Sequence, residues 1–173
     1  MQDFVHLHVH TQYSLLDGQA SVARLVDKAM KNGMKGIAVT DHGNMFGIKE
    51  FTNYVNKKNS GPKGEVKDLK KRIAGIEAGT IECADKEAEI AACKAKIVEA
   101  ENKLFKPVIG CEMYVARRTM DLKEGKPDQS GYHLIVLAKN EKGYHNLIKL
   151  VSHAWTRGYY MRPRTDRSEL EKY

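Results

Sequence analysis

Three histidines, His6, His8 and His10, occupy alternate positions near the amino terminus, and an aliphatic residue stands between each pair. Because successive side chains of a β-strand point to opposite faces, this alternation predicts a strand that carries all three imidazoles on one face. An imidazole is costly to bury unless both of its ring nitrogens have partners. Three imidazoles on one face therefore indicate a polar centre, and a bound metal ion is the simplest physical explanation for it.

Strands and helices are predicted to alternate on both sides of a middle segment. The predicted elements are a strand over residues 4–10, a helix over 22–30 capped by Ser21, a strand over 36–40, a helix that begins near Asn44, strands over 108–115 and 132–138, and a helix capped by Asn140. This order is typical of a parallel sheet or an α/β barrel.

The middle segment, residues 59–105, has a different composition, rich in lysine, glutamate and alanine. Turn-forming residues over 59–64 predict a linker, and apolar residues then recur in heptad steps over 66–76 and 90–104. One continuous helix over residues 66–104 would carry the chain about 58 Å away at about 1.5 Å per residue. Because the next strand should begin nearby, we predict an antiparallel helical hairpin that turns within 78–85. The hairpin either docks a partner protein or is an insertion whose two helices pack only against each other.

Imidazoles and carboxylates gather at the carboxyl ends of the predicted strands, where α/β proteins place their working residues. They are His8 and His10 on the first strand, Asp17 in the following loop, Asp41 and His42 after the second strand, and Glu112 within the third. Such ligands suit zinc, manganese or iron, and a carboxylate such as Glu112 can bridge two ions. Paired ions about 3.5–4 Å apart can activate water for attack on a phosphoryl group, so the pattern predicts phosphoester hydrolysis.

Three of the polar residues have alternative interpretations. His6 lies farthest from the carboxyl end of its strand and is interpreted as a supporting or core histidine, and Asp41 can orient a neighbouring imidazole. His133 begins its strand, so a parallel strand would keep it away from the other ligands. It reaches them only if the third strand continues past Glu112 and forms an antiparallel hairpin with the fourth. Otherwise His133 is structural, and the pattern leaves both alternatives open.

The composition limits the compartment and the partners. Of the 173 residues, 42% are hydrophobic and 29% are charged, as in a globular domain with a substantial core. No apolar run approaches the roughly 20 residues of a membrane span, and we expect no signal peptide. The three cysteines form no Cys-x-x-Cys pair, so we expect a cytoplasmic protein without a disulfide framework. The net charge of +7 permits a nucleic-acid partner, although solvated lysines explain it equally well.

Four motifs resemble the polymerase and histidinol phosphatase (PHP) domain family, and in particular its members in bacterial replicative DNA polymerases. They are HLHVHTQYSLLDG (6–18), TDHGNMFG (40–47), KPVIGCEMYVA (106–116) and YHLIVLAKN (132–140). The resemblance covers nearly all of the chain except about residues 58–105. It implies that residues 1–173 form an incomplete (βα)7 distorted TIM-like barrel of the PHP type, into which the helical hairpin over 59–105 is inserted.

The resemblance also implies a centre for up to three divalent metal ions. The family's ligands fall on His8, His10, Asp17, His42, Glu112 and His133, which supports the hairpin alternative for His133. His8, His10 and Glu112 would take part in catalysis, and Asp41 and His6 would support the ligands. Further family ligands, the last barrel strands and the polymerase region would lie outside this chain. Coordination would then be incomplete, and a dimer could cover the apolar surface left open.

The function implied by the resemblance is that of the amino-terminal PHP part of a DNA-directed DNA polymerase, active in DNA replication. In the family, this domain either removes 3′ nucleotides as a metal-dependent proofreading exonuclease or serves as a non-catalytic, metal-stabilised scaffold. The expected partners are DNA, the rest of the polymerase chain and the replisome subunits. A stand-alone histidinol-phosphatase-like enzyme is a third alternative. The sequences of residues 15–18 and 41–47 disfavour it, because they resemble the polymerase members of the family.

Overall fold

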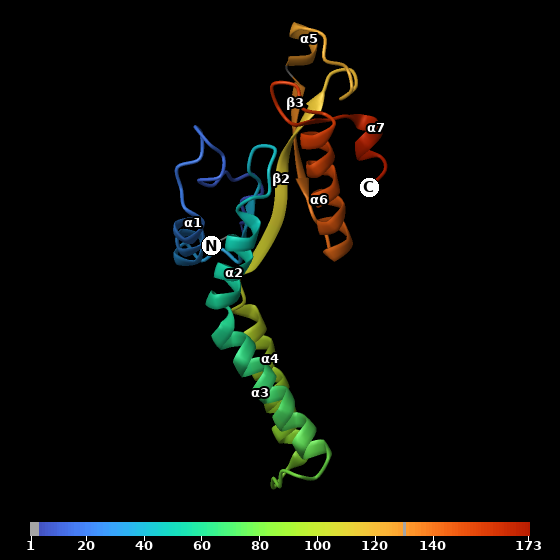
Figure 1. Ribbon diagram of the computed structural model, residues 1–173. Helices are drawn as coiled ribbons and strands as arrows, with labels where there is room; N and C mark the ends of the chain where they lie inside the picture. The colour runs from blue at the N-terminus through green and yellow to red at the C-terminus, as the bar shows by residue number, and fades with distance from the viewer. Residues whose placement is uncertain (1–3, 130) are drawn as a thin grey trace. The chain divides into compact units, whose positions relative to one another are not determined.

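The computed structural model describes residues 4–129 and 131–173 (Figure 1). Its elements, in chain order, are α1 (Val22–Lys31), β1 (Gly36–Val39), α2 (Ile48–Lys58), α3 (Ser60–Glu77), α4 (Lys86–Asn102), β2 (Lys106–Ala116), α5 (Lys126–Gln129), β3 (Gly131–Leu137), α6 (Glu141–Thr156), β4 (Arg164–Thr165) and α7 (Arg167–Leu170). The chain divides into two compact units, one of Met1–Asn53 with Pro107–Tyr173 and the other of Tyr54–Lys106.

A mixed sheet centred on β2 forms the middle of the larger unit. β1 and β3 are the neighbours of β2, and the short β4 also pairs with β2. β3 runs antiparallel to β2 and places His133 opposite Tyr114, whereas β4 runs parallel to β2 and places Arg164 opposite Tyr114. Just beyond β1, His42 forms a parallel bridge with Glu112. The α/β class predicted from the sequence is therefore confirmed.

The two faces of β2 have different surroundings. Cys111 and Met113 belong to a buried apolar cluster that also contains four residues of α6: Leu147, Leu150, Val151 and Ala154. Because successive residues of a strand alternate between its faces, Glu112 and Tyr114 project from the opposite face. The apolar face of β2 thus packs on α6, and the other face is left for polar side chains.

Local signals explain the helix that follows the first loop. α1 contacts β1, and its buried residues recur with helical spacing: Val22, Val26 and Ala29. The Ser21 hydroxyl accepts a hydrogen bond from the first turn, as an N-cap does. Gly33 follows the helix with a φ of 75°, a conformation that glycine adopts without a steric penalty. The predicted helix over 22–30 is therefore found at Val22–Lys31.

The histidine-rich segment before α1 is not the regular strand that its alternation predicts, because the backbone bends at Leu7 and His8. The segment lies beside β1, where the Ala38 amide donates to the His6 carbonyl and the Thr40 amide to the Val9 carbonyl, both at 2.9 Å. The two donors are two residues apart, but the two acceptors are three apart. One extra residue therefore interrupts the alternation, as in a β-bulge, and the three histidines do not share one face.

A buried arginine organises the chain between β2 and β3. Arg164 is 1% exposed, and its guanidinium donates to four backbone carbonyls at 2.9–3.1 Å, those of Gly158, Asp128, Met120 and Leu122. The Asp128 carboxylate in turn accepts two hydrogen bonds from Arg118. These contacts hold the connection after β2 against β4, because a buried guanidinium must satisfy its donors within the protein.

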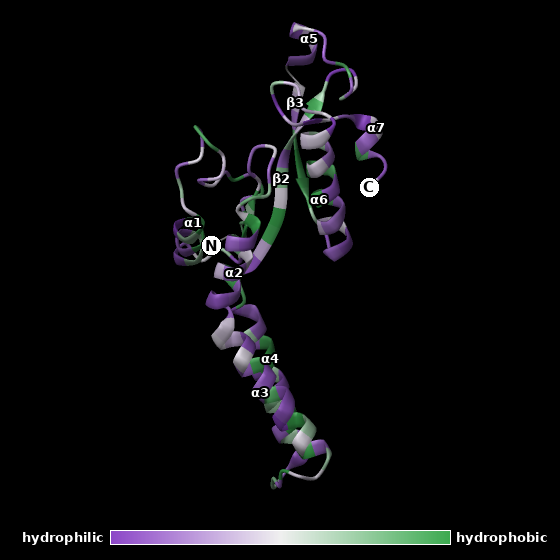
Figure 2. Ribbon diagram, in the orientation of Figure 1, coloured by the Kyte–Doolittle hydropathy of each residue, from purple (hydrophilic) through white to green (hydrophobic). Residues whose placement is uncertain are grey.

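The smaller unit contains α3 and α4, which pack against each other. Ile76, Cys93 and Ala100 are buried, and Figure 2 shows hydrophobic residues interspersed with hydrophilic ones along both helices. The predicted linker over 59–64 is wrong, because α3 already begins at Ser60. A proline is tolerated there, since the first turn of a helix does not need its amide hydrogen.

A buried amide joins the two ends of this segment. Asn59 Nδ2 donates to the Phe105 carbonyl at 2.8 Å, and the Phe105 amide donates to Asn59 Oδ1 at 3.0 Å. One side chain thus satisfies both backbone groups of a buried residue. In the described ranges 4–129 and 131–173, no helix combines the length and the apolar composition needed to cross a membrane.

Candidate metal centre

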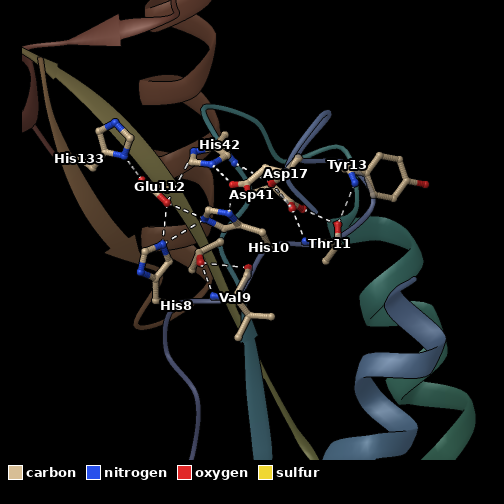
Figure 3. Close-up of polar contacts among 12 residues, drawn as sticks. His8, Val9, His10, Thr11, Tyr13, Asp17, Asp41, His42, Glu112 and His133 are labelled. Atoms are coloured by element: carbon tan, nitrogen blue, oxygen red, sulfur yellow. Dashed lines mark hydrogen bonds and ion pairs between the residues drawn. The ribbon is translucent and has the colours of Figure 1, made fainter. Parts of the chain in front are cut away.

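Glu112 is the central carboxylate of a cluster of imidazoles (Figure 3). Its side chain is only 2% exposed, because β2 projects it away from α6 into the space between three neighbouring segments. Oε2 lies 2.6 Å from the Nε2 atoms of both His8 and His10, and Oε1 contacts Nδ1 of His133. A single carboxylate therefore meets three imidazoles, and each of its oxygens is used.

Asp17 supplies a second carboxylate to the same cluster. Its Oδ2 atom lies 2.9 Å from His10 Nδ1 and 2.6 Å from His42 Nε2. The His10 ring thus faces Glu112 with one nitrogen and Asp17 with the other. Figure 3 shows these side chains pointing toward one another from separate parts of the chain. The six candidate ligands predicted from the sequence are therefore brought together in one place.

Three overlapping groups in this cluster have the composition of a metal site. They are His8, His10 and Glu112; His10, Asp17 and His42; and His42, Glu112 and His133, each with ligand atoms within 4.8 Å of one another. Each group offers two imidazole nitrogens and one carboxylate oxygen, the ligands that zinc, manganese and iron accept. The arrangement can hold divalent metal, and its overlapping groups suit more than one ion.

One ring nitrogen of His42 shows whether the residues of the cluster are suited to bind a cation. Within the described chain, His42 Nδ1 is buried and has no hydrogen-bond partner. It lies 3.7 Å from Glu112 Oε2, beyond hydrogen-bond distance. Ligand atoms of one tetrahedral zinc ion, with bonds of about 2.0–2.1 Å, are roughly 3.3–3.4 Å apart. A buried nitrogen without a partner is unfavourable in a protein interior, so the residues fit a divalent cation that would accept this lone pair.

A second pair of ring nitrogens leads to the same conclusion. The Nε2 atoms of His8 and His10 lie 3.1 Å apart while both face the same oxygen of Glu112. If both nitrogens carried protons toward that oxygen, two positive N–H groups would crowd each other. If only one did, the other nitrogen would still face the same carboxylate oxygen with its lone pair at 2.6 Å, and if neither did, three lone pairs would face one another without a donor. One divalent cation would relieve each of these arrangements, because it accepts all three lone pairs.

Both carboxylates of the cluster are held in the ionised form that metal binding requires. Burial raises the pKa of Glu112, but hydrogen bonds from His8, His10 and His133 outweigh it, so the net pKa lies below its ordinary value. Hydrogen bonds from His42 and His10 lower the pKa of Asp17. The cluster therefore presents two negative charges among imidazoles, in the electrostatic arrangement of a cation site.

Asp41 acts on a loop and not directly on an imidazole ring. Its buried carboxylate accepts hydrogen bonds from Thr11 N at 2.6 Å, Thr11 Oγ1 at 2.8 Å and Ser14 Oγ at 2.7 Å. The Ser14 hydroxyl also accepts a bond from the His42 amide at 3.1 Å. Asp41 therefore holds the loop that carries Asp17 beside the backbone of His42, which differs from the interpretation that it orients an imidazole side chain.

His6 lies outside the cluster. Its exposed ring packs edge-on against Phe4, with the ring centres 4.7 Å apart. The extra residue between His6 and Val9 accounts for this, because it separates His6 from the alternation that His8 and His10 share. The placement does not support the interpretation of His6 as a buried core residue.

His133 reaches the cluster through the pairing of β2 with β3. β2 continues past Glu112 to Ala116, and the antiparallel register sets His133 opposite Tyr114. This is the hairpin alternative that the sequence leaves open. The start of an antiparallel strand lies beside the carboxyl end of its neighbour, so His133 meets Glu112 although it begins its own strand.

Tyr114 is a residue of this site that the sequence reasoning missed. Its ring stacks on His42 at 5.9 Å with an interplanar angle of 8°, and it meets His133 edge-on at 4.9 Å. The available signal is its spacing, because it stands two residues after Glu112 and shares that face of β2. The Tyr114 ring thus limits the orientations that the His42 and His133 rings can adopt.

The family model of the PHP domain matches residues 6–98 and 89–173 of this sequence. These matches span the segments that carry the clustered ligands, and the chain belongs to the PHP domain family. The family resemblance of its four motifs is thereby confirmed.

Curated relatives narrow the comparison within the family. The chain is 41% identical to the DNA polymerase III subunit alpha of Borreliella burgdorferi over 98% of its own length. Subunits of the same name from Treponema pallidum and Aquifex aeolicus are 38% and 34% identical over 98% and 99% of the chain. The chain covers 11%, 11% and 12% of these relatives, so it spans about a tenth of their length.

Proposed function

We propose that this chain is the PHP part of a DNA polymerase III alpha subunit and serves DNA replication. The similarity to subunits of that name extends over 98–99% of the chain at 34–41% identity, which supports the proposal. The parent protein would be a DNA-directed DNA polymerase. Its partners would be DNA, the rest of the polymerase chain and the other subunits of the replisome.

The fold proposed for this part is an incomplete (βα)7 distorted TIM-like barrel. The position of the cluster supports it, since His42 follows the carboxyl end of β1 and forms a parallel bridge with Glu112 in the carboxyl-terminal half of β2. Residues 59–105 are proposed to be an inserted helical hairpin. The two hydrogen bonds between the Asn59 side chain and the Phe105 backbone support an insertion, because they hold the two ends of the segment together.

The chemistry proposed for the cluster is metal-dependent hydrolysis of a phosphodiester at the 3′ end of DNA. His8, His10, Asp17, His42, Glu112 and His133 would hold the ions, which could be zinc, manganese or iron. When bound, divalent ions activate water and stabilise negative charge on a phosphoryl group. Glu112 would bind through both carboxylate oxygens, and Tyr114 would restrict the His42 and His133 rings. His8 and His133 are 55% and 45% exposed, which leaves an approach for substrate.

The observation that carries this proposal is the buried, unpartnered Nδ1 of His42 among ionised carboxylates. A non-catalytic scaffold is the second candidate function. It is favoured by the way in which one cluster joins four segments that are distant in sequence, from His8 to His133. A metal that binds only the folded arrangement would stabilise it by mass action, without any catalysis.

Metal content tests the site, and strand cleavage tests the catalytic role. We expect the purified chain to retain manganese, zinc or iron by elemental analysis, and Glu112→Ala to lose it. His145→Ala, in an exposed histidine on α6, is the matched control and should keep the metal. Retention of the metal by Glu112→Ala would refute the site.

Release of 3′ nucleotides from a 5′-labelled DNA strand is the second measurement. Wild type and His145→Ala should release nucleotides with manganese or zinc, and His10→Ala should not. A metal-loaded wild type that releases none would refute the exonuclease and leave the scaffold.

A further inference from the structure

Arg162 packs against Tyr114, an aromatic residue of the candidate metal centre. Its guanidinium carbon is 4.9 Å from the centre of the Tyr114 ring. The same ring stacks on His42 and meets His133 edge-on. Tyr114 therefore connects an exposed cation to two candidate metal ligands, although Arg162 itself is distant in sequence from the predicted motifs.

The backbone around Arg162 is held in a defined conformation. Met161 has a φ of 62°, which non-glycine residues rarely adopt, and the Tyr160 amide donates to the Arg162 carbonyl at 3.0 Å. A side chain at Gly43 would come within 2.6 Å of Pro163, so the turn packs closely against the residue after His42. The next arginine, Arg164, is buried. A strained turn held from both sides is often part of a functional site.

The charge of Arg162 has no carboxylate partner within residues 4–129 and 131–173 that the structure describes. Two exposed arginines nearby in sequence do have such partners, since Arg157 pairs with Asp121 at 2.5 Å and Arg167 pairs with Glu171 at 2.8 Å. Arg162 is exposed, and its guanidinium packs on the Tyr114 ring. A guanidinium oriented by such a ring keeps its donors free, and its planar donors suit the oxygens of a phosphate.

We propose that Arg162 is a substrate-binding residue that holds a phosphodiester of a single-stranded DNA end. This inference rests on the proposed function of the metal centre. The guanidinium and the His42 ring lie 4.9 and 5.9 Å from the Tyr114 ring, so Arg162 contacts a phosphate adjacent to the one at the metals. Its contact fixes the position of the strand along the site, while the clustered ligands act on the terminal linkage.

Two variants of Arg162 and one control distinguish binding from a structural role. Arg162→Ala removes the charge and the ring contact, and Arg162→Lys keeps the charge without the planar donors. Arg167→Ala removes one positive charge from a side chain that is 91% exposed and lies on α7. The affinity for a fluorescent single-stranded DNA is measured by anisotropy at several salt concentrations, with metal content determined on each sample.

We expect Arg162→Ala to weaken DNA binding about five- to thirty-fold. The slope of log affinity against log salt should become shallower by about 0.7, the value for one phosphate contact on a single strand. Arg162→Lys should keep the salt slope, with an affinity between those of wild type and Arg162→Ala. Arg167→Ala should bind like wild type, and all variants should retain metal.

Two results would overturn the proposal. One is an Arg162→Ala variant that binds DNA with the same affinity and salt slope as Arg167→Ala. The other is a loss of DNA affinity in Arg162→Ala that occurs only together with a loss of metal. This result would show that Arg162 has a structural role and only keeps Tyr114 and His42 in position. The binding assay does not require cleavage, so the two proposals can fail separately. A chain that releases no nucleotide, but whose affinity for DNA falls in Arg162→Ala, would refute the exonuclease and support the role of Arg162 in binding DNA.

Discussion

The loop that carries Asp17 should lose its position when Asp41 is changed to asparagine. The carboxylate of Asp41 is buried and accepts three hydrogen bonds of 2.6–2.8 Å, two from Thr11 and one from Ser14. An asparagine has the same size but only one acceptor oxygen, so at least one buried donor would face an amide group. A hydrogen bond to a charged group contributes about 1.5–3 kcal/mol, and we expect Asp41→Asn to cost about 2–3 kcal/mol.

The same substitution should weaken metal binding, although Asp41 touches no imidazole ring. A displaced Asp17 loses its contacts with His10 and His42, which are 2.9 and 2.6 Å long. Loss of a group that orients metal ligands typically reduces metal affinity about 10–100-fold. Urea denaturation of the metal-free chain gives the change in stability, and competition with a fluorescent chelator gives the change in metal affinity.

Asp68→Asn is the matched control, because it makes the same chemical change at an exposed position on α3. It should alter neither the unfolding midpoint nor the metal affinity. An Asp41→Asn variant with wild-type stability and wild-type affinity would refute the reasoning that Asp41 holds the loop. A loss of stability with unchanged affinity would show that the loop can move without disturbing Asp17.

Three further predictions follow from single positions. Gly43→Ala should cost about 1–3 kcal/mol in thermal unfolding, because φ is 58° and the added carbon would lie 2.6 Å from Pro163; unchanged stability would contradict it. Asn59→Ala should cost about 2–4 kcal/mol by leaving both buried backbone groups of Phe105 unpaired, and faster amide exchange at Phe105 would reveal it. Burial raises the pKa of Asp166, but hydrogen bonds from the Met120 amide and neighbouring groups outweigh it and lower the pKa overall. Its stabilising contribution is therefore present above the unfolded pKa of about 3.9 and lost as pH falls through the lower folded value. The stability difference between wild type and Asp166→Asn should shrink from pH 7 to pH 3 in urea titrations, and a constant difference would contradict this.

Local signals account for the parts that the sequence predicts well. The helix at Val22–Lys31 follows from a serine cap, a helical repeat of apolar residues and a terminal glycine, all within a few residues of one another. The strand at Lys106–Ala116 follows in the same way from an apolar run with a β-forming composition. The linker predicted over 59–64 fails because glycine and proline also fit the first turn of α3, and tertiary packing overrides their weak preference.

The candidate ligands were predictable as a set because imidazoles and carboxylates at strand ends are unusual and chemically specific. His8, His10, Asp17, His42 and Glu112 needed only the assumption that the carboxyl ends of neighbouring strands meet. Their individual contacts were not predictable. The role of Asp41 depends on which donors of the loop reach it, and this is set by the folded path of residues 11–14.

The histidine motif by itself indicated a polar centre near the amino terminus, because buried imidazoles need partners for their ring nitrogens. The tertiary structure alone decided which histidines belong to it. His6 is excluded by one extra residue in the pairing with β1, and His133 is included by its register opposite Tyr114. Both depend on hydrogen bonds between segments that are far apart in the chain. A shift of one residue in such a pairing turns a side chain to the other face, and no local pattern specifies it.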